Sequence, residues 1–279
     1  MPSNVFDLNS AFVYYVNQVD ARTKGKNFAN FLDVLNTDQV QLTVTGDPTY
    51  SPALSLQSLH GSHQSLATSS FSNSTTVQDT ATFNQSETHT ASFSVAVTEG
   101  IKLGAQTKVT AGIPFLVGSE INLSAEATLS STQTTSSTES QTFSINTQIN
   151  VPPNSRIEAS LVIDELQYTG ILTSNVRVAG SLRVTPPKGQ GNAFTVTMAQ
   201  LFIALKAVTG NITFSKKDSA GNSFSFTTAD LNRFTVTTPP NQVAYKSTSN
   251  ITANFGASQN VQIKQFDLKS GRMVSQSTL

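Results

Sequence analysis

The chain has 279 residues and equal numbers of basic and acidic side chains, 17 of each, so its formal net charge is zero. A chain without net positive charge does not attract nucleic acid or anionic lipid through its overall charge. We therefore expect no nucleic-acid partner, and we expect any membrane to be reached through a receptor or apolar contact. The absence of cysteine excludes disulfides and thiolate chemistry. Because Thr, Val, Ile and Phe favour strands, the composition predicts a mainly β protein.

The N-terminal region, residues 1–64, is predicted to form a small head lobe that contains helices. Residues 10–22 carry apolar side chains on one helical face, and Ser10 is placed to cap that helix. Residues 28–35 repeat apolar side chains at helical spacing and predict a second short helix. We expect part of 186–240 to join this lobe.

Three tyrosines are candidate receptor-binding residues, on the hypothesis that they form an exposed aromatic patch: Tyr14, Tyr15 and Tyr50. The alternative interpretation is that their rings pack in the core or at its rim.

The segment His60-Gly61-Ser62-His63 has two imidazoles but no nearby Cys, Asp or Glu. Metal sites need three or four convergent ligands, so this segment predicts a surface loop and no metal site.

Two Ser/Thr-rich runs, residues 65–99 and 130–150, flank the centre of the chain. Flexible linkers are one interpretation of such composition. However, Gly and Pro are nearly absent from both runs and strand-forming residues recur in them. We therefore predict long antiparallel strands.

Between these runs, residues 101–129 are predicted to form an amphipathic β-hairpin, because side chains alternate between the faces of a strand. Odd positions are apolar and form the expected lipid-facing side: Ile101, Leu103, Ala105, Val109, Ala111, Ile121, Leu123, Ala125, Ala127 and Leu129. Hairpin turns normally carry polar residues. Here the expected turn is an apolar run: Ile113, Pro114, Phe115, Leu116 and Val117.

The length of the predicted arms matches a membrane. About 11 residues rise roughly 36 Å, and a tilt of about 45° reduces this to about 25 Å, the height of the apolar band of a membrane β-barrel. An amphipathic hairpin lying on a sheet in water shows the same alternation. The apolar turn and the matched arms favour membrane insertion.

A longer motif surrounds the apolar turn. The run GIPFLVGSEINLSAE is preceded by TEGIKLGAQTKV and followed by Val151-Pro152-Pro153-Asn154-Ser155. In order and spacing, these segments resemble the pore module of the aerolysin-type β-pore-forming toxins, on the epsilon-toxin and mosquitocidal-toxin branch, over roughly residues 80–185. The resemblance implies a mainly β, elongated protein with long antiparallel strands, a β-sandwich tail and a small helix-containing head lobe.

This resemblance also implies a division of the chain after the head lobe. The expected parts are a pore-forming β module at 65–185, an additional β segment at 186–240, and the strands and tail that complete a sandwich at 241–279. Residues 194–208 fit a strand or a helix equally. Relatives are often activated by protease trimming, and Lys269 and Arg272 suit a trypsin-type enzyme. The alternative is a frayed terminus.

In function, the resemblance implies a toxin that binds a cell-surface receptor, protein or glycan, and inserts into the target-cell membrane. We expect an insecticidal, extracellular protein, either secreted or released from inclusions. The N-terminus MPSNVFDLNS lacks the basic and apolar segments of a signal peptide. No apolar run reaches 18 residues, so no membrane-spanning helix is expected.

A lone hairpin cannot cross a bilayer, because its open edges would leave backbone groups unpaired in hydrocarbon at several kcal/mol each. Several chains must therefore close a barrel, which predicts a homo-oligomer. If the turn centres on Pro114, Lys102 faces Glu126 and Lys108 faces Glu120. These four charged residues are the expected lining of the pore lumen.

Three other classes of protein are alternatives to a pore-forming toxin. A carbohydrate-binding or adhesin-like β-sandwich explains the composition but not the apolar turn. An enzyme is not expected, because the chain has no G-x-S-x-G elbow, phosphate-binding loop or H-E-x-x-H motif, and no cofactor is expected either. A capsid or fibre protein is a further alternative.

Overall fold

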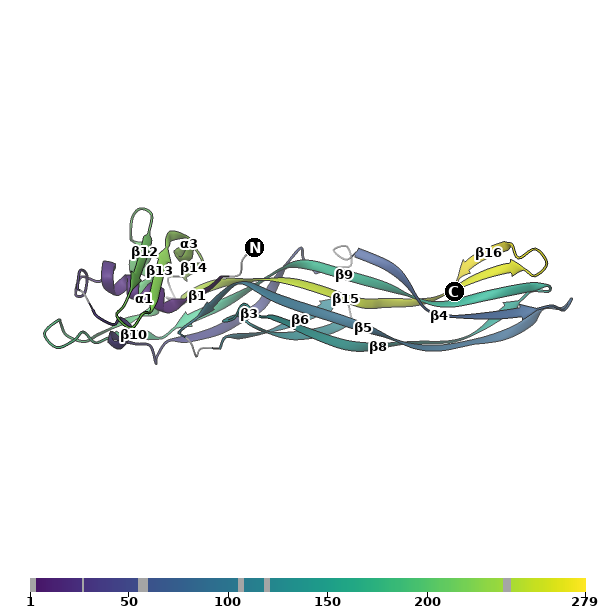
Figure 1. The fold of residues 1–279 in the computed structure, drawn as a ribbon, viewed down its shortest axis with the longest axis horizontal. Coiled ribbons are helices and arrows are strands. Elements are labelled where there is room, and N and C mark those ends of the chain that lie inside the picture. Colours follow the sequence, from purple (N-terminus) through teal and green to yellow (C-terminus); the bar gives the residue numbers. More distant parts are fainter. Residues whose placement is uncertain (1–3, 27, 55–59, 105–107, 118–120, 238–241) are drawn as a thin grey trace.

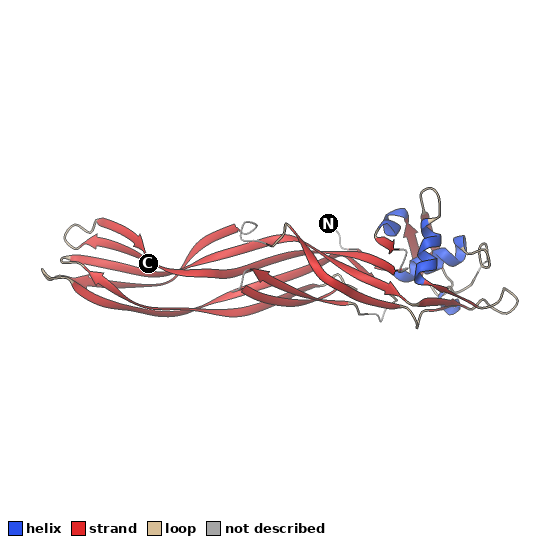
Figure 2. Cartoon of the chain, turned by 180° about the vertical axis from the view of Figure 1, so that it is seen from behind, coloured by secondary structure: helices blue, strands red, loops and turns tan. Residues whose placement is uncertain are grey.

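The protein is elongated, with its helices gathered at one end (Figures 1 and 2). The computed structural model describes residues 4–26, 28–54, 60–104, 108–117, 121–237 and 242–279. Strands predominate among these residues. The predicted fold class is therefore confirmed: long antiparallel strands form the body, and a small lobe with helices forms the head.

The body is organised around two very long antiparallel strands, β9 (Ser155–Ala179) and β15 (Gln242–Asp267). They pair from Val243↔Val178 to Asp267↔Ser155 with one irregularity, between Gly256 and Ser258. Side chains of β15 alternate between buried and more exposed positions along most of its length. The sequence placed β9 in the pore-forming module of residues 65–185 and β15 in the separate segment 241–279, so it did not show that these two strands pair.

Four further strands flank this central pair. β5 (Asp79–Lys102) pairs with β15 and carries β8 (Thr134–Val151) on its outer side. On the other side, β3 (Gln41–Ser51) and β4 (His60–Asn73) follow each other along β9. β3 and β4 thus belong to the body, although the sequence assigned residues up to 64 to the head.

At the end far from the head, β5 and β8 face β4, β9 and β15 across a second apolar core. Its buried members are Phe83, Ile149, Val151, Ile157, Ala159, Leu161 and Val261. β5 leaves β15 after the pair Asn254↔Ser92. Beyond that point the Gln141 side chain takes over as partner: it donates to the Gly256 carbonyl at 3.3 Å and accepts from the Gly256 amide at 2.9 Å.

The C-terminal tail is a strand rather than a frayed end. β16 (Met273–Thr278) pairs antiparallel with β15 at Gln262–Phe266. Lys269 and Arg272, the candidate cleavage sites, lie exposed between the two strands.

The head combines two distant parts of the chain. The N-terminal part supplies β1 (Asn4–Asp7), α1 (Leu8–Tyr14), a π-helical turn (Tyr15–Val19) and a 3-10 turn (Leu32–Val34). The later part supplies α2 (Met198–Lys206), β12 (Thr213–Lys217), β13 (Ser223–Thr227), α3 (Thr228–Asn232) and β14 (Phe234–Thr237). A small sheet of β2 (Leu35–Asn36), β10 (Ser181–Val184) and β11 (Phe194–Thr197) joins them.

Two local predictions for the head need correction. α1 is capped by Asp7, whose side chain accepts from the Asn9 amide, and not by Ser10. Residues 28–35 do not form an α-helix. Phe28, Phe31 and Val34 are buried at a spacing of three, which is the period of the observed 3-10 turn.

The segment 60–63 is the start of β4 and not a surface loop. β9 offers an edge to which it pairs, and the His63 Nδ1 lies 2.6 Å from Asp164 Oδ1 across the ladder. Among the described residues, no group of three or more His, Cys, Asp or Glu side chains is arranged to hold a metal ion.

Candidate functional site

The predicted hairpin is present as β6 (Thr110–Val117) and β7 (Ile121–Thr128). The two strands pair from Thr110↔Thr128 to Val117↔Ile121, so odd residues face odd residues and even face even. In the described part of the chain they form a two-stranded sheet of their own, separate from the long sheet.

One face of this hairpin is buried and the other is exposed. The odd-numbered side chains Val109, Ala111, Ile113, Ala127 and Leu129 are all buried. On the even-numbered face, Lys108, Gly112, Ser124 and Glu126 are exposed. Alternation in the sequence therefore corresponds to alternation in burial, as expected for a strand.

The buried face packs on the body of the protein. It belongs to the same core as Phe93, Val95 and Val97 of the Ser/Thr-rich strand β5. β7 also packs beside β8, and β6 beside β3. Burial of such a face is worth about 25 cal/mol per Å² of apolar surface removed from water. The hairpin is therefore held in place largely by apolar contact.

The first predicted arm, 101–111, is not one strand in this structure. Ile101 and Lys102 end β5, where β1 pairs beside them, with Phe6 opposite Ile101 and Asp7 opposite Lys102. Gly104 then turns the chain with φ +66°, a conformation that favours glycine. The next strand begins only at Thr110.

The predicted turn is displaced as well. Ile113 to Val117 belong to β6 and pair with β7, so they do not form the turn in this structure. Lys102 and Glu126 are not paired in this structure either. Glu126 lies opposite Gly112, and the Lys102 Nζ is 3.9 Å from Asp7 Oδ2.

Some predicted site residues fall outside what the structure describes. Ala105 and Glu120 lie outside the described residues. For another group the described part covers the backbone but not the side chains: Pro114, Phe115, Leu116, Val117, Ile121, Leu123 and Ala125. Leu103 is half-buried and packs against the main core.

The exposed aromatic patch is absent, because the three tyrosines pack in the protein. Tyr14 is 8% exposed, with its ring centroid 5.3 Å from that of Phe214, and Tyr15 is 6% exposed. Burial raises the pKa of Tyr15 to about 12, and its hydroxyl donates to Asp20 at 2.8 Å. Tyr50 is half-buried beside Tyr168. These contacts follow from the fold of the head and of β3, which sequence spacing alone did not reveal.

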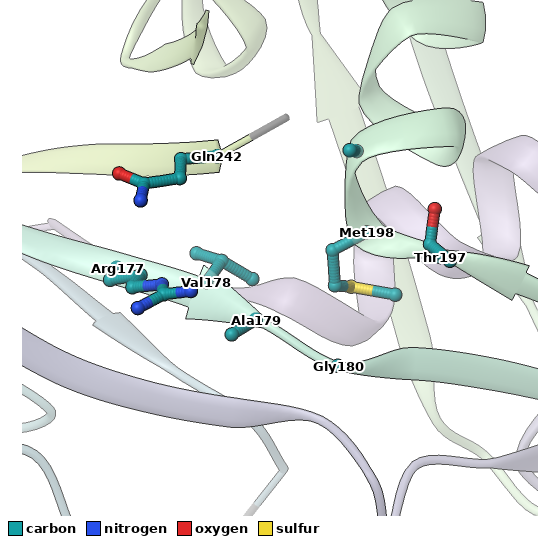
Figure 3. Close-up of a pocket in the computed structure, with 8 residues that line it drawn as sticks. Arg177, Val178, Ala179, Gly180, Thr197, Met198 and Gln242 are labelled. Carbon is teal, nitrogen blue, oxygen red and sulfur yellow. The ribbon is translucent and has the colours of Figure 1, made fainter. Parts of the chain in front are cut away.

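Two hollows lie where the head meets the body. A cavity of about 230 Å³ lies between the end of β9 with the following Gly180, the start of α2 and Gln242, and Figure 3 shows residues that line it. A larger cleft of about 770 Å³ is lined by residues of β1, β5, β9 and β15, and by Arg233. In this cleft Arg233 forms an ion pair with Glu99 at 3.1 Å. Sequence reasoning did not find this pair, because its members are distant in the chain.

Comparison with known proteins agrees with this architecture. Residues 14–273 match the family described as Clostridium epsilon toxin ETX/Bacillus mosquitocidal toxin MTX2. The chain belongs to this family, which is one of aerolysin-like pore-forming toxins. No curated protein sequence matches the chain. In the described residues, no helix is both long and apolar enough to cross a membrane.

Solved structures share the fold at low sequence identity. One is from the Cry23Aa1 and Cry37Aa1 binary protein complex, with a TM-score of 0.60 and 18% identity over 99% of this chain and 95% of that chain. A crystal protein of Bacillus thuringiensis described as non-toxic has a TM-score of 0.64 and 14% identity over 96% and 100%. The Mpp75Aa1.1 β-pore-forming protein of Brevibacillus laterosporus has a TM-score of 0.51 and 18% identity over 88% and 74%.

Proposed function

We propose that this toxin binds a receptor on insect cells, assembles into a ring and inserts the β6–β7 hairpin and its flanking residues into the membrane as part of a β-barrel. The observation that carries the proposal is that the hairpin is amphipathic and pairs with no other strand of the described chain. A resemblance in fold is insufficient by itself, since a protein of the same fold is described as non-toxic.

The isolated pairing of the hairpin makes its release physically feasible. The β6–β7 hydrogen bonds lie within the hairpin, so detachment from the body breaks none of them. The main loss on release is the burial of residues such as Ile113 and Leu129 against the body. Hydrocarbon restores an apolar environment to the same face, so the free energy lost on detachment is offset in the membrane.

Closure into a barrel requires more than one chain. Each monomer contributes two strands, whose outer edges must find partners before they meet hydrocarbon. Neighbouring copies supply such edges, and receptor binding concentrates the copies on one surface. Tyr14 and Tyr15 are excluded as a receptor-binding surface, because both are buried.

Release of a self-quenched dye from vesicles of insect gut brush-border membrane tests this function. We expect the protein to release dye and electron microscopy to show rings on the same vesicles. Binding without dye release and without rings would favour the carbohydrate-binding or adhesin-like alternative. A matched sample with protein-free buffer gives the background leakage.

A further inference from the structure

Two different strand registers meet at Leu129, at the base of the hairpin. The β5–β8 ladder ends with Ala96 opposite Thr134, and its continuation by five residues places Ile101 opposite Leu129. The Ile101 amide does donate to the Leu129 carbonyl, at 3.1 Å. The β6–β7 ladder begins with Thr110 opposite Thr128, which places Val109 opposite the same Leu129. The Leu129 amide donates to the Val109 carbonyl at 2.7 Å.

Leu129 is therefore bonded to two residues that lie eight positions apart in the chain. Residues 102–108, here named the stored segment, separate its two partners in the sequence. Its start is secured by Asp7, whose Oδ1 accepts from the Gly104 amide at 3.2 Å and whose Oδ2 lies 3.9 Å from Lys102 Nζ. The parallel pairing of β1 with residues 99–102 secures the same point.

The stored hairpin is also short for its proposed task. β6 and β7 have 8 residues each. Eight residues rise about 26 Å, which a tilt of about 45° reduces to roughly 19 Å, below the apolar band of about 25 Å. Transmembrane strands need about 9–11 residues. The stored segment would supply the missing length.

We propose that insertion replaces the stored register of the hairpin with the register of the β5–β8 ladder, by drawing residues 102–108 into the first arm. The two arms then slide past each other by eight residues, and the turn moves to Phe115. This exchange of register rests on the proposed function. It converts the observed hairpin into arms of about 101–113 and 117–129.

The new register suits the chemistry of the sequence. Because the slide is an even number of residues, every side chain keeps its face. Most odd-numbered pairs are apolar, with Leu103 opposite Ala127 in place of Ala111, although Leu123 meets Thr107 and Ala111 meets Ser119. Lys102 lies opposite Thr128 and diagonal to Glu126, within reach of a long side chain. The apolar run from Ile113 to Val117 becomes the turn that leads across the bilayer.

The pair Gly112 and Glu126 distinguishes sliding from insertion of an unchanged hairpin. These residues face each other in the stored register, Glu126 is exposed, and no atom lies within 4 Å of a Cβ added at Gly112. The chain has no cysteine, so Gly112→Cys with Glu126→Cys yields a single defined disulfide. We expect the oxidised variant to leak dye at least about 100-fold more slowly than the reduced variant. Equal leakage by the two forms would overturn the exchange of register.

Two further variants complete the test. Ser215→Cys with Ser225→Cys joins an exposed pair in the head hairpin, and its oxidised form should leak like the unmodified protein. Lys108→Cys with Asn122→Cys is opposed only in the new register, so its disulfide should form on brush-border vesicles and not before. Absence of that disulfide from leaking samples also contradicts the proposal. If the unmodified protein does not leak, the proposed function itself fails, which is a separate result.

Discussion

Two hairpins in the described part of the molecule each form a two-stranded antiparallel sheet, and they differ in how the chain enters and leaves them. The head hairpin, β12–β13, leads directly from β13 into α3, and Asp218 closes its turn by accepting from the Asn222 amide at 2.9 Å. The chain enters the β6–β7 hairpin through residues 102–108, which separate the two hydrogen-bond partners of Leu129, Ile101 and Val109. Both hairpins bury one face, so amphipathicity does not distinguish them. They differ instead in the segments that connect them to the rest of the chain.

The largest expected difference between the two hairpins comes from charges at the apolar run. Leu116→Asp together with Val117→Asp should abolish dye release, because two carboxylates per chain would have to enter hydrocarbon at the leading end of the hairpin. Ser223→Asp with Ser225→Asp places the same charges on the exposed side of the head hairpin and should leave leakage unchanged. Circular dichroism checks that both variants fold. Full leakage by the first variant would refute the role of the run in crossing the membrane.

Removal of the Asp7 carboxylate tests whether this side chain holds the start of the stored segment in place. Asp7→Ala removes the bonds from Asn9 and Gly104 and the nearby charge for Lys102. Thr197→Ala removes a comparable cap from α2 in the head. We expect each to cost about 1 kcal/mol of folding stability, but only Asp7→Ala should raise hydrogen exchange in residues 108–113, by about tenfold. Equal exchange in the two variants would count against Asp7 as the restraint.

Charge reversal on the polar face should change the pore without abolishing it. Lys102→Glu with Lys108→Glu adds negative charge where the lumen is expected, so the reversal potential under a KCl gradient should shift toward cation preference. Lys217→Glu in β12 is the matched control and should leave the potential unchanged. An unshifted potential in the double variant would argue against a lumenal position for these lysines.

The smallest expected effect is a pH dependence of the stability of the head. Hydrogen bonds from Arg22 lower the pKa of Asp20, and hydrogen bonds from Asn222 lower the pKa of Asp218. A depressed pKa in the folded state adds stability above the unfolded value of about 3.9, and this stability is lost as pH falls further. Thermal unfolding followed from pH 6 to pH 3 should therefore show the head losing stability below about pH 4. Asp20→Asn should flatten that loss, and an unchanged profile would show that Asp20 contributes little.

Much of the fold was predictable because its signals are local. Alternation over residues 110–128 and the β-forming composition of 65–99 each depend on a few neighbouring residues. The pattern over residues 101–111 also predicted one continuous arm, which the structure interrupts at Gly104. If the register exchanges on insertion, that pattern describes the inserted hairpin rather than the stored one.

What sequence reasoning missed depends on distant partners. The burial of Tyr14 against Phe214, the ion pair of Arg233 with Glu99 and the continuity of β15 all require segments separated by 100 residues or more, or a neighbouring strand. The register of the hairpin was misjudged for a similar reason. Alternation with a period of two is compatible with any even shift, so it cannot select one turn position.

The sequence by itself determined which side chains share a face of the hairpin and which class of toxin this chain resembles. That information lies in the order of apolar and polar residues and survives any even change of register. Only the tertiary structure decided where the hairpin is stored, which residues cover it and that Leu129 joins two ladders. Those features depend on the available surface of β5, β8 and β1, which the chain creates only when it folds.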